Sequence, residues 1–294
     1  MRKGFLVVMY FAVFLSLFSV QCWADVGKIK KKVEIEYKFV QEFGEYKLGL
    51  WEKTTYEYDE KGNLITESFS GKKIVYDHDE RGNLIARTEY DPYLGVLKEK
   101  ATYEYDKGGN LITLTEYDSK GNLEGKIIFK CDEKGNRVEA ISYDSKGKLE
   151  IKTIYKYDER GNLIELVRYD SEGKLGTKNV YKYDEKGNKI EELWYYKGDL
   201  LFRDIFRYNE KGNVIEIEQL RYGLRGLYVF KYSDKGNLIE EAKYDYEGKL
   251  EEKCIYKYSI VGKLLEEMEY IYKFAFGELQ EIPVKKIIYE YEYY

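Results

Sequence analysis

The chain has 294 residues, of which 44% are hydrophobic and 35% are charged, and it contains 33 tyrosines but only 2 prolines. This aromatic content excludes a disordered chain. With 49 basic and 54 acidic residues, the formal net charge is −5. An acidic balance of this kind gives no support for nucleic-acid binding.

Residues 1–24 have the pattern of a secretory signal peptide, with two basic residues followed by a long apolar run. Cys22 and Ala24 place small side chains at the two positions that precede a cleavage site. We therefore expect cleavage after Ala24 and export to the periplasm, the cell surface or the extracellular space. Two alternatives stay open, namely lipidation of Cys22 and an uncleaved anchor. Apart from this segment, we expect no contact with a membrane.

Three segments follow from the patterning of the whole chain. The signal peptide, 1–24, is followed by N-terminal lead-in strands in 25–55, where alternating apolar residues predict a strand and Gly44 a break. Residues 56–294 form an array of hairpin repeats. No linker rich in proline or serine interrupts this array, so we expect one repeat domain.

The phrase Tyr-Lys-Tyr-Asp-Glu-Arg-Gly-Asn-Leu-Ile at 155–164 is the unit that recurs along the array. It predicts a strand, a tight turn and a second strand, because aspartate caps such turns and Gly161 can adopt a positive φ. Asp158 should pair with Asn162, which sets Tyr157 opposite Leu163. The same geometry predicts six further pairs: Tyr58 with Leu64, Tyr105 with Leu111, Tyr117 with Leu123, Tyr143 with Leu149, Tyr169 with Leu175, and Tyr244 with Leu250.

The repeat is 26 residues long between Asn110, Asn136, Asn162 and Asn188, and each repeat holds two strands and two turns. Counting degraded copies gives 18 turns and therefore about 19 strands. The turns are expected at 59–63, 69–73, 79–83, 91–95, 106–110, 118–122, 132–136, 144–148, 158–162, 170–174, 184–188, 196–199, 209–213, 222–226, 233–237, 245–249, 259–263 and 274–278.

The predicted fold is all-β, a repetitive antiparallel β-hairpin meander. Alternation places Tyr155 and Tyr157 on one face, to which the next strand should add Leu163 and Val167, while Leu166 joins the opposite face. So many strands seldom stay flat, so we expect a curved or spiral sheet, like a solenoid or shell, with the tyrosines inside. A single-layer elongated sheet stays open as an alternative.

Two cysteines follow the leader, Cys131 and Cys254, and ten turns separate them. In a flat meander they would lie roughly 48 Å apart at about 4.8 Å per strand. A disulfide needs Cα atoms within about 7 Å. We therefore predict two free thiols.

The recurring Tyr-x-Tyr-Asp-x-x-Gly-Asn-Leu phrase resembles the YD repeats, also called RHS repeats, of bacterial surface and secreted proteins. The resemblance covers roughly residues 54–265. It implies a β-meander wound into a spiral or shell, with roles in surface display, adhesion, carbohydrate binding or the enclosure of a toxin. The large toxin-enclosing members carry a C-terminal effector, for which we expect no counterpart, because the last expected strand is 285–294. The second turn of the repeat, as in 170–174, is similar to that of shorter secreted repeat proteins.

No residue pattern indicates catalysis, so we expect a protein that is not an enzyme and that uses no cofactor or metal. Acidic pairs such as Asp158-Glu159 recur at turn after turn, where the aspartate has a capping role. His78 occupies the position that Tyr157 has in its own copy, and Cys131 occupies the same position in another. No second histidine is present to activate that thiol.

Trp194 and Tyr196 are the candidate ligand-binding residues. Trp194 is expected on the face opposite the tyrosines, and Tyr196 replaces a turn aspartate. An exposed tryptophan beside a tyrosine could stack on a sugar or anchor a partner. The alternative is local packing of Trp194 on Ile190.

The patterns predict a secreted or cell-surface repeat protein that binds or displays a partner, either a glycan or a protein. One alternative is a structural envelope or matrix protein that assembles through open sheet edges. Another is an outer-membrane β-barrel, suggested by the alternation and by the aromatic residues Tyr291, Tyr293 and Tyr294. Glu165 and Glu191 argue against the barrel, because they interrupt any apolar band.

Overall fold

The computed structural model describes residues 28–42, 45–275 and 278–294. All secondary-structure elements in these ranges are β-strands. The strands are β1 (Ile29–Glu42), β2 (Glu45–Tyr58), β3 (Leu64–Phe69), β4 (Lys72–His78), β5 (Leu84–Tyr90), β6 (Leu97–Tyr105), β7 (Leu111–Tyr117), β8 (Leu123–Cys131), β9 (Arg137–Asp144), β10 (Leu149–Tyr157), β11 (Leu163–Tyr169), β12 (Leu175–Tyr183), β13 (Lys189–Tyr196), β14 (Asp199–Tyr208), β15 (Val214–Arg221), β16 (Leu224–Tyr232), β17 (Leu238–Tyr244), β18 (Leu250–Tyr258), β19 (Leu264–Ala275) and β20 (Glu278–Tyr293). The break expected at Gly44 separates β1 from β2, so the count is 20 rather than about 19.

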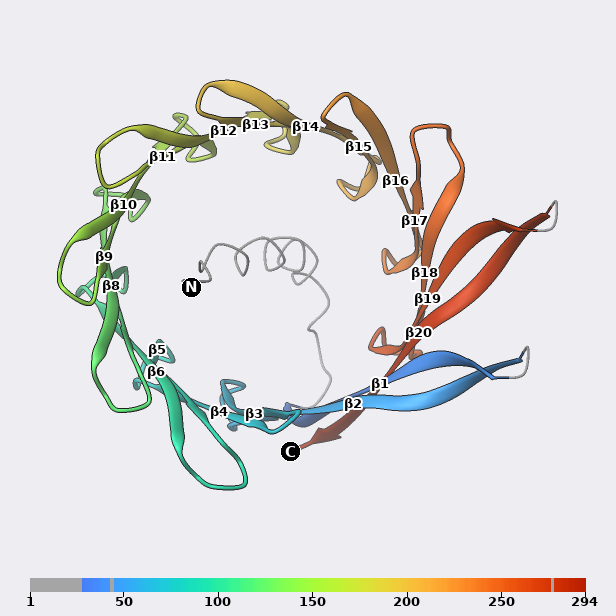
Figure 1. Cartoon of the computed structure of the whole chain (residues 1–294), viewed down its shortest axis with the longest axis horizontal. Helices are drawn as coiled ribbons and strands as arrows, with labels where there is room; N and C mark the ends of the chain where they lie inside the picture. The colour runs from blue at the N-terminus through green and yellow to red at the C-terminus, as the bar shows by residue number, and fades with distance from the viewer. Residues whose placement is uncertain (1–27, 43–44, 276–277) are drawn as a thin grey trace.

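The sheet closes into a barrel. Each strand pairs antiparallel with the next one in the chain, and β1 also pairs with β20, from Ile29 opposite Tyr293 to Lys38 opposite Lys285 (Figure 1). We call the β20–β1 pairing the seam. The prediction of an open curved or spiral sheet is corrected by this closure, which gives both terminal strands a backbone partner. An assembly through open sheet edges therefore has no basis along the paired parts of β1 and β20.

The turns have the predicted geometry, which the 158–162 turn illustrates. The Asp158 N–H donates to the Asn162 carbonyl at 2.9 Å, and the Gly161 N–H donates to the Asp158 carbonyl at 3.1 Å. The Asp158 carboxylate accepts hydrogen bonds from the Arg160 and Asn162 amides at 3.0 and 2.8 Å and from the Asn162 side chain at 2.9 Å. Gly161 has φ +87°, which glycine adopts without steric cost. Both carboxylate oxygens of Asp158 therefore accept hydrogen bonds from residues of its own turn.

The predicted cross-strand pairs are all present, including Tyr157 opposite Leu163. The face assignment beyond them was wrong. A β-bulge follows Leu163, so Leu166 lies opposite Tyr155 while Val167 lies opposite Ile154. The extra residue of a bulge reverses the alternation of everything that follows it. Leu166 therefore shares the tyrosine face, and Val167 lies on the other.

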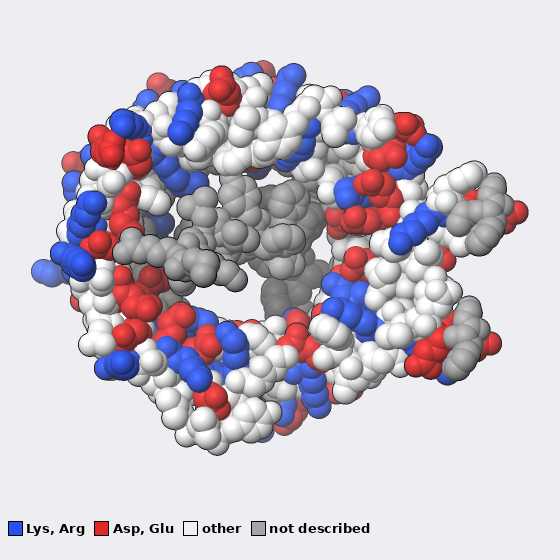
Figure 2. Space-filling view, viewed as in Figure 1, with Lys and Arg blue, Asp and Glu red and all other residues white. Residues whose placement is uncertain are grey.

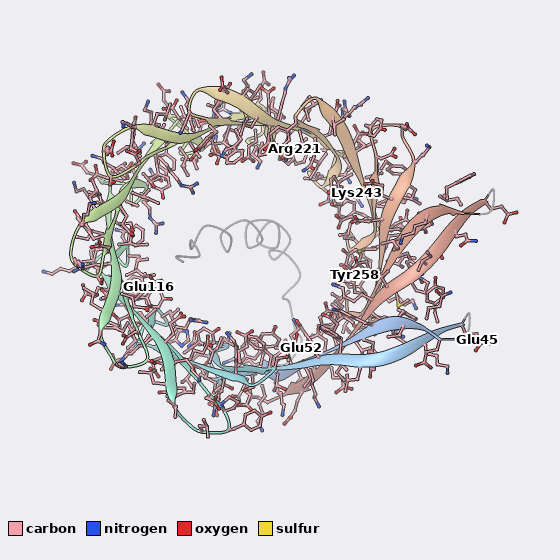
Figure 3. All side chains as sticks on the ribbon, viewed as in Figure 1. Glu45, Glu52, Glu116, Arg221, Lys243 and Tyr258 are labelled. Atoms are coloured by element: carbon pink, nitrogen blue, oxygen red, sulfur yellow. The ribbon has the colours of Figure 1, made fainter. Side chains whose placement is uncertain are left out.

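The tyrosine face lines the inside of the barrel. Figure 3 shows Arg221, Lys243 and Tyr258 on the inner side of the ribbon. Directly opposed residues of neighbouring strands share a face, so the paired registers extend this assignment around the ring. Figure 2 shows an opening that runs through the ring along the viewing direction. We call this space the lumen. The tyrosines of the Tyr-x-Tyr phrase are inside, as predicted, whereas the tyrosines before the second turns, such as Tyr169 opposite Lys152, lie on the outer face.

The outer face carries ion-paired triads between aliphatic residues. Glu165 contacts Lys156 and Lys178 at 2.6 Å each, and these two cations lower the pKa of the Glu165 carboxyl. Ile154 and Val167 lie on the same face. Equivalent triads are Lys130–Glu139–Lys152, Lys182–Glu191–Arg203, Lys231–Glu240–Lys253 and Lys257–Glu266–Lys286.

The hydrophobic core is a thin layer of side chains that pack against each other on either side of the single sheet. No large side chain of the described residues is less than 2% exposed. The clearest cluster is formed by Phe206, Ile217 and Phe230 on the inner face of β14 to β16, where Tyr208 and Tyr228 pack around it. Packing within one layer explains why the chain needs so many long aromatic side chains.

Candidate lumenal binding surface

The Tyr-x-Tyr phrase places two aromatic side chains of each copy on the lumenal face. The second tyrosine also fixes the preceding strand, because the Tyr157 hydroxyl donates to the Arg137 carbonyl at 2.9 Å. Burial raises the pKa of Tyr208 to about 12, so its hydroxyl stays a donor. The equivalent bonds run from Tyr105 to Leu84, Tyr183 to Leu163, Tyr208 to Lys189, Tyr232 to Val214 and Tyr291 to Leu264, at 2.7–3.0 Å.

Trp194 lies on the lumenal face, so its expected place opposite the tyrosines was wrong. It is directly opposite Asn179 of β12, which alternates with Tyr181 and Tyr183 on one face. The reversal has the same cause as before, a bulge where β13 leaves its turn. On the other side, Trp194 is opposite Phe202 of β14.

Trp194 is half-buried in an aromatic stack rather than exposed on its own. Its ring lies 4.6 Å from that of Phe202 with an interplanar angle of 8°, and Tyr222 meets Phe202 edge-on at 5.2 Å. The packing therefore involves Phe202, whereas the alternative considered from the sequence was packing on Ile190. We call Trp194, Phe202 and Tyr222 the aromatic stack.

Charged and amide groups surround the aromatic stack. The Arg221 guanidinium lies 4.7 Å from the Phe202 ring and donates to an Asp204 oxygen at 2.8 Å. Across β12 and β13, the Asn179 amide donates to Glu192 at 3.3 Å, and Lys189 contacts the same carboxylate at 2.8 Å. Flat aromatic faces beside such hydrogen-bonding groups have the chemistry needed to bind a sugar or another polar ring.

Tyr196 lies two residues further along β13, at the end of the strand, and is 46% exposed. The Lys197 ammonium lies 5.3 Å from its ring. The structure therefore joins Trp194 with Phe202 and Arg221, which the sequence reasoning missed, and leaves Tyr196 at the margin. The two-residue turn between β13 and β14 gave no signal for this contact, because it would set Trp194 opposite Leu201, and a bulge in β14 brings Phe202 opposite Trp194 instead.

The other residues considered for catalysis or metal binding occupy ordinary cross-strand pairing positions of the repeat. His78 is opposite Leu84, and Cys131 is opposite Arg137, as their place in the repeat predicted. Cys131 and Cys254 are free thiols on strands ten apart in the ring of twenty, which agrees with the prediction. Burial raises the pKa of Cys254 to about 12.

Two further findings concern the described ranges only. No group of three or more His, Cys, Asp or Glu side chains in them could hold a metal ion. Likewise, they contain no helix that is long and apolar enough to cross a membrane. The signal peptide and Cys22 lie outside the described residues.

Comparisons with known proteins found similarity in solved structures alone. No protein-family model matches the chain, and no curated protein matches its sequence. A porin-like protein from Bacteroides uniformis is similar with a TM-score of 0.40 and 12% identity over 90% of this chain and 98% of that one. The crystal structure of TcdB2-TccC3-TEV is similar with a TM-score of 0.37 and 12% identity, over 82% of this chain and 16% of that one. A Photorhabdus luminescens Tc holotoxin pore gives a TM-score of 0.31 at 12% identity, over 83% of this chain and 18% of that one. These scores carry no functional argument.

Proposed function

We propose that the chain is an exported barrel that binds an extended polar polymer, a glycan in the first place, inside its lumen. The supporting observation is the inner wall, where the aromatic stack stands beside Arg221, Asp204 and Glu192. The sequence predicted binding on an exposed sheet surface, and we now propose that binding takes place on the inner face of the barrel.

The circumference of the barrel supports a ligand of this size. Twenty strands at about 4.8 Å each give roughly 96 Å around the ring, and therefore a backbone diameter of about 30 Å. Barrels with many more than eight strands leave space that side chains do not fill. A single polysaccharide or peptide chain fits into such a space.

The outer wall favours water rather than lipid on the outside. Ion-paired glutamates such as Glu165 and Glu191 lie on this face. Many strands are short, such as β11 with 7 residues and β12 with 9. A membrane-spanning strand needs about 9–11 residues and an unbroken apolar band on its outer side.

An outer-membrane pore is the second candidate, and closure of the sheet favours it. The barrel has an even number of antiparallel strands, which is the rule for bacterial outer-membrane barrels. Purification of the exported chain distinguishes the two candidate functions. Recovery as a monomer without detergent supports the lumenal binding protein, whereas a need for detergent and conductance in a planar bilayer would establish the pore.

Fluorescence tests the binding proposal directly. Residues 25–294 contain two tryptophans, so Trp51→Phe leaves Trp194 as the reporter. We expect one or more soluble glycans from a panel of cell-wall polymers to change its emission, and heat-unfolded protein to give no response. Trp194→Ala should weaken retention on the same immobilised glycan by about tenfold or more, because stacked aromatic residues dominate such sites.

Tyr196→Ala is the matched control, since Tyr196 lies outside the aromatic stack and should change retention little. Thermal unfolding of each variant separates lost binding from lost structure. Unchanged retention of a folded Trp194→Ala protein would remove the aromatic stack from the proposal.

A further inference from the structure

The seam differs from every other junction of the barrel in its covalent connection. All other neighbouring strands are consecutive in the chain, whereas β20 and β1 come from opposite ends of it. Their pairing spans Ile29 to Lys38, and the Tyr294 N–H adds a bond to the Lys28 carbonyl at 2.9 Å. Local opening there would break no hairpin, so the seam is the one junction between the described strands whose two sides no turn holds together.

Lys32 and Glu34 hold the lumenal side of the seam. The Lys32 ammonium contacts a Glu34 carboxylate oxygen at 2.5 Å and lies over the rings of Tyr56 and Tyr289, at 5.3 and 5.1 Å. Tyr289 of β20 is directly opposite Glu34 of β1, and Tyr56 donates to the same carboxylate at 3.2 Å. This cluster joins side chains of β20, β1 and β2.

Carboxylates and phenols alternate beside this cluster. The Tyr289 hydroxyl donates to Glu267 of β19 at 3.3 Å, and Tyr256 of β18, which is opposite Glu267, donates to Glu241 of β17 at 3.3 Å. We call Glu241, Tyr256, Glu267, Tyr289, Glu34 and Tyr56 the acidic row. The row crosses the seam, and beyond it Tyr56 is opposite Glu67 of β3, to which the Tyr76 hydroxyl of β4 donates at 2.8 Å.

Three strand pairs on the far side of the barrel are apolar at the equivalent positions: Leu114 is opposite Tyr103, Ala140 is opposite Phe129, and Leu166 is opposite Tyr155. Glu192, which is opposite Tyr181 of β12, is an exception there. The hydrogen-bonded chain of glutamates and phenols is nevertheless found at the seam and not at these three pairs.

Burial raises the pKa of both Glu241 and Glu267 above the usual range of a glutamate, and neighbouring carboxylates raise each further. Lys285 opposes this effect at Glu267. The groups that face Glu241 are Tyr232, Glu252, Cys254, Tyr256 and Glu267, and those that face Glu267 are Cys254, Tyr256, Tyr258, Glu269, Lys285, Tyr289 and Glu34.

The sign of the effect follows from linkage. A carboxyl whose pKa is higher in the closed barrel than in an opened, hydrated form is neutral in both forms well below its ordinary pKa of about 4.3. As the pH rises through the window between the two values, the closed form holds a proton that the open form has lost. Above that window, the closed form must hold a buried charge, so closure is weaker at neutral and alkaline pH.

We propose that the seam is a lateral gate to the lumen, and that protonation of Glu241 and Glu267 tightens it. The inference rests on the proposed function, because a closed barrel admits an internal stretch of a long polymer only if its wall opens. A polymer would enter sideways at higher pH and be enclosed in mild acid.

Hydrogen exchange measured by mass spectrometry tests the gate without any ligand. The full chain is expressed with its own leader and purified, and exchange is compared at pH 5 and pH 8 after correction for intrinsic rates. We expect amides of β20 and β1 to be protected about tenfold more at pH 5 than at pH 8. Peptides from β10 and β11 should show no such change.

The double variant Glu241→Gln, Glu267→Gln should abolish the pH dependence at the seam. Glu165→Gln on the outer face is the control and should preserve it. Seam amides that open no more readily than those of β10, or a pH dependence that survives the double variant, would overturn the gate. Because no glycan is present, this outcome is independent of whether the aromatic stack binds one.

Discussion

At five turns the preceding tyrosine joins two neighbouring strands through its hydroxyl, namely at Tyr105, Tyr157, Tyr183, Tyr208 and Tyr232. Tyr183 is opposite the strand end of its own hairpin, and its hydroxyl reaches the carbonyl of Leu163 at 2.8 Å. Phenylalanine would keep the ring but lose the hydroxyl that makes this bond. This explains why tyrosine rather than phenylalanine dominates the position.

Tyr183→Phe should therefore lower the free energy of unfolding by about 1 kcal/mol, because it removes one partly buried hydrogen bond to the Leu163 carbonyl. Urea unfolding followed by fluorescence measures the change. Tyr246→Phe is the control, since Tyr246 is 62% exposed at a turn and should stay within experimental error of the parent. Equal effects at the two sites would show that the bond carries no weight.

Three hairpin turns of the described residues hold a non-glycine residue at positive φ, and Lys197 with φ +50° is one of them. Asparagine tolerates this conformation better than lysine. Lys197→Asn should raise stability by about 0.5 kcal/mol, which is the low end for such replacements. A small rise in the unfolding temperature is the expected result, and a fall would mean that contact of Lys197 with Tyr196 outweighs the strain.

At the scale of the turn, the aspartates make the barrel sensitive to acid. The Asn162 side chain and backbone amides lower the pKa of the Asp158 carboxyl, and the same arrangement lowers that of Asp59, Asp79 and Asp184. A lowered pKa contributes stability above the ordinary value of about 3.9, and this contribution is lost as the pH falls through the value in the folded state.

We expect the urea midpoint to fall steeply below about pH 4. Asparagine replaces aspartate naturally in the 209–213 turn, where the Asn209 side chain accepts hydrogen bonds from the Lys211 and Asn213 amides at 3.0 Å. Replacing several turn aspartates with asparagine, as in Asp158→Asn, should therefore keep the fold and reduce the fall of the urea midpoint below about pH 4. If the midpoint of this variant falls as steeply as that of the parent, other carboxyls cause the acid sensitivity.

The turns and the pairing could be read from the sequence because they depend on neighbours in the chain. Asp158, Gly161 and Tyr157 fix a local hairpin whatever the rest of the molecule does. The bulge after Leu163 could not be read in this way, since nothing in Leu-Ile marks an extra residue. For the same reason, Trp194 was assigned to the wrong face and its contact with Phe202 was missed.

At the scale of the molecule, closure is a long-range event that repeat counting does not predict. An open and a closed sheet contain the same turns and nearly the same registers, and they differ by the pairing of β20 with β1. The alternating tyrosines predicted which face of the sheet would be the inner one. The number of strands needed to close the ring, however, depends on the twist accumulated over all the strands.

Closure predicts the behaviour of a shortened chain. Deleting β20, residues 278–294, leaves two unpaired edges on β1 and β19, and such edges associate with one another. We expect concentration-dependent oligomers in gel filtration, whereas the parent should elute as a monomer. A truncated chain that stays monomeric and cooperative in unfolding would show that the seam adds little to the fold.

Gain or loss of whole 26-residue repeats would change the diameter of the barrel in fixed steps. Each duplication inserts two strands, which widens the circumference by about 9.6 Å and the diameter by about 3 Å. An odd number of strands never arises in this way, so every descendant can still close antiparallel. Loss of 137–162 in one event would give an 18-stranded ring from the 20-stranded one, with the same turns and the same wall chemistry. Recombination between similar turns would thus adjust the width of the lumen to the thickness of the polymer it binds, and the residues of the remaining repeats would stay the same.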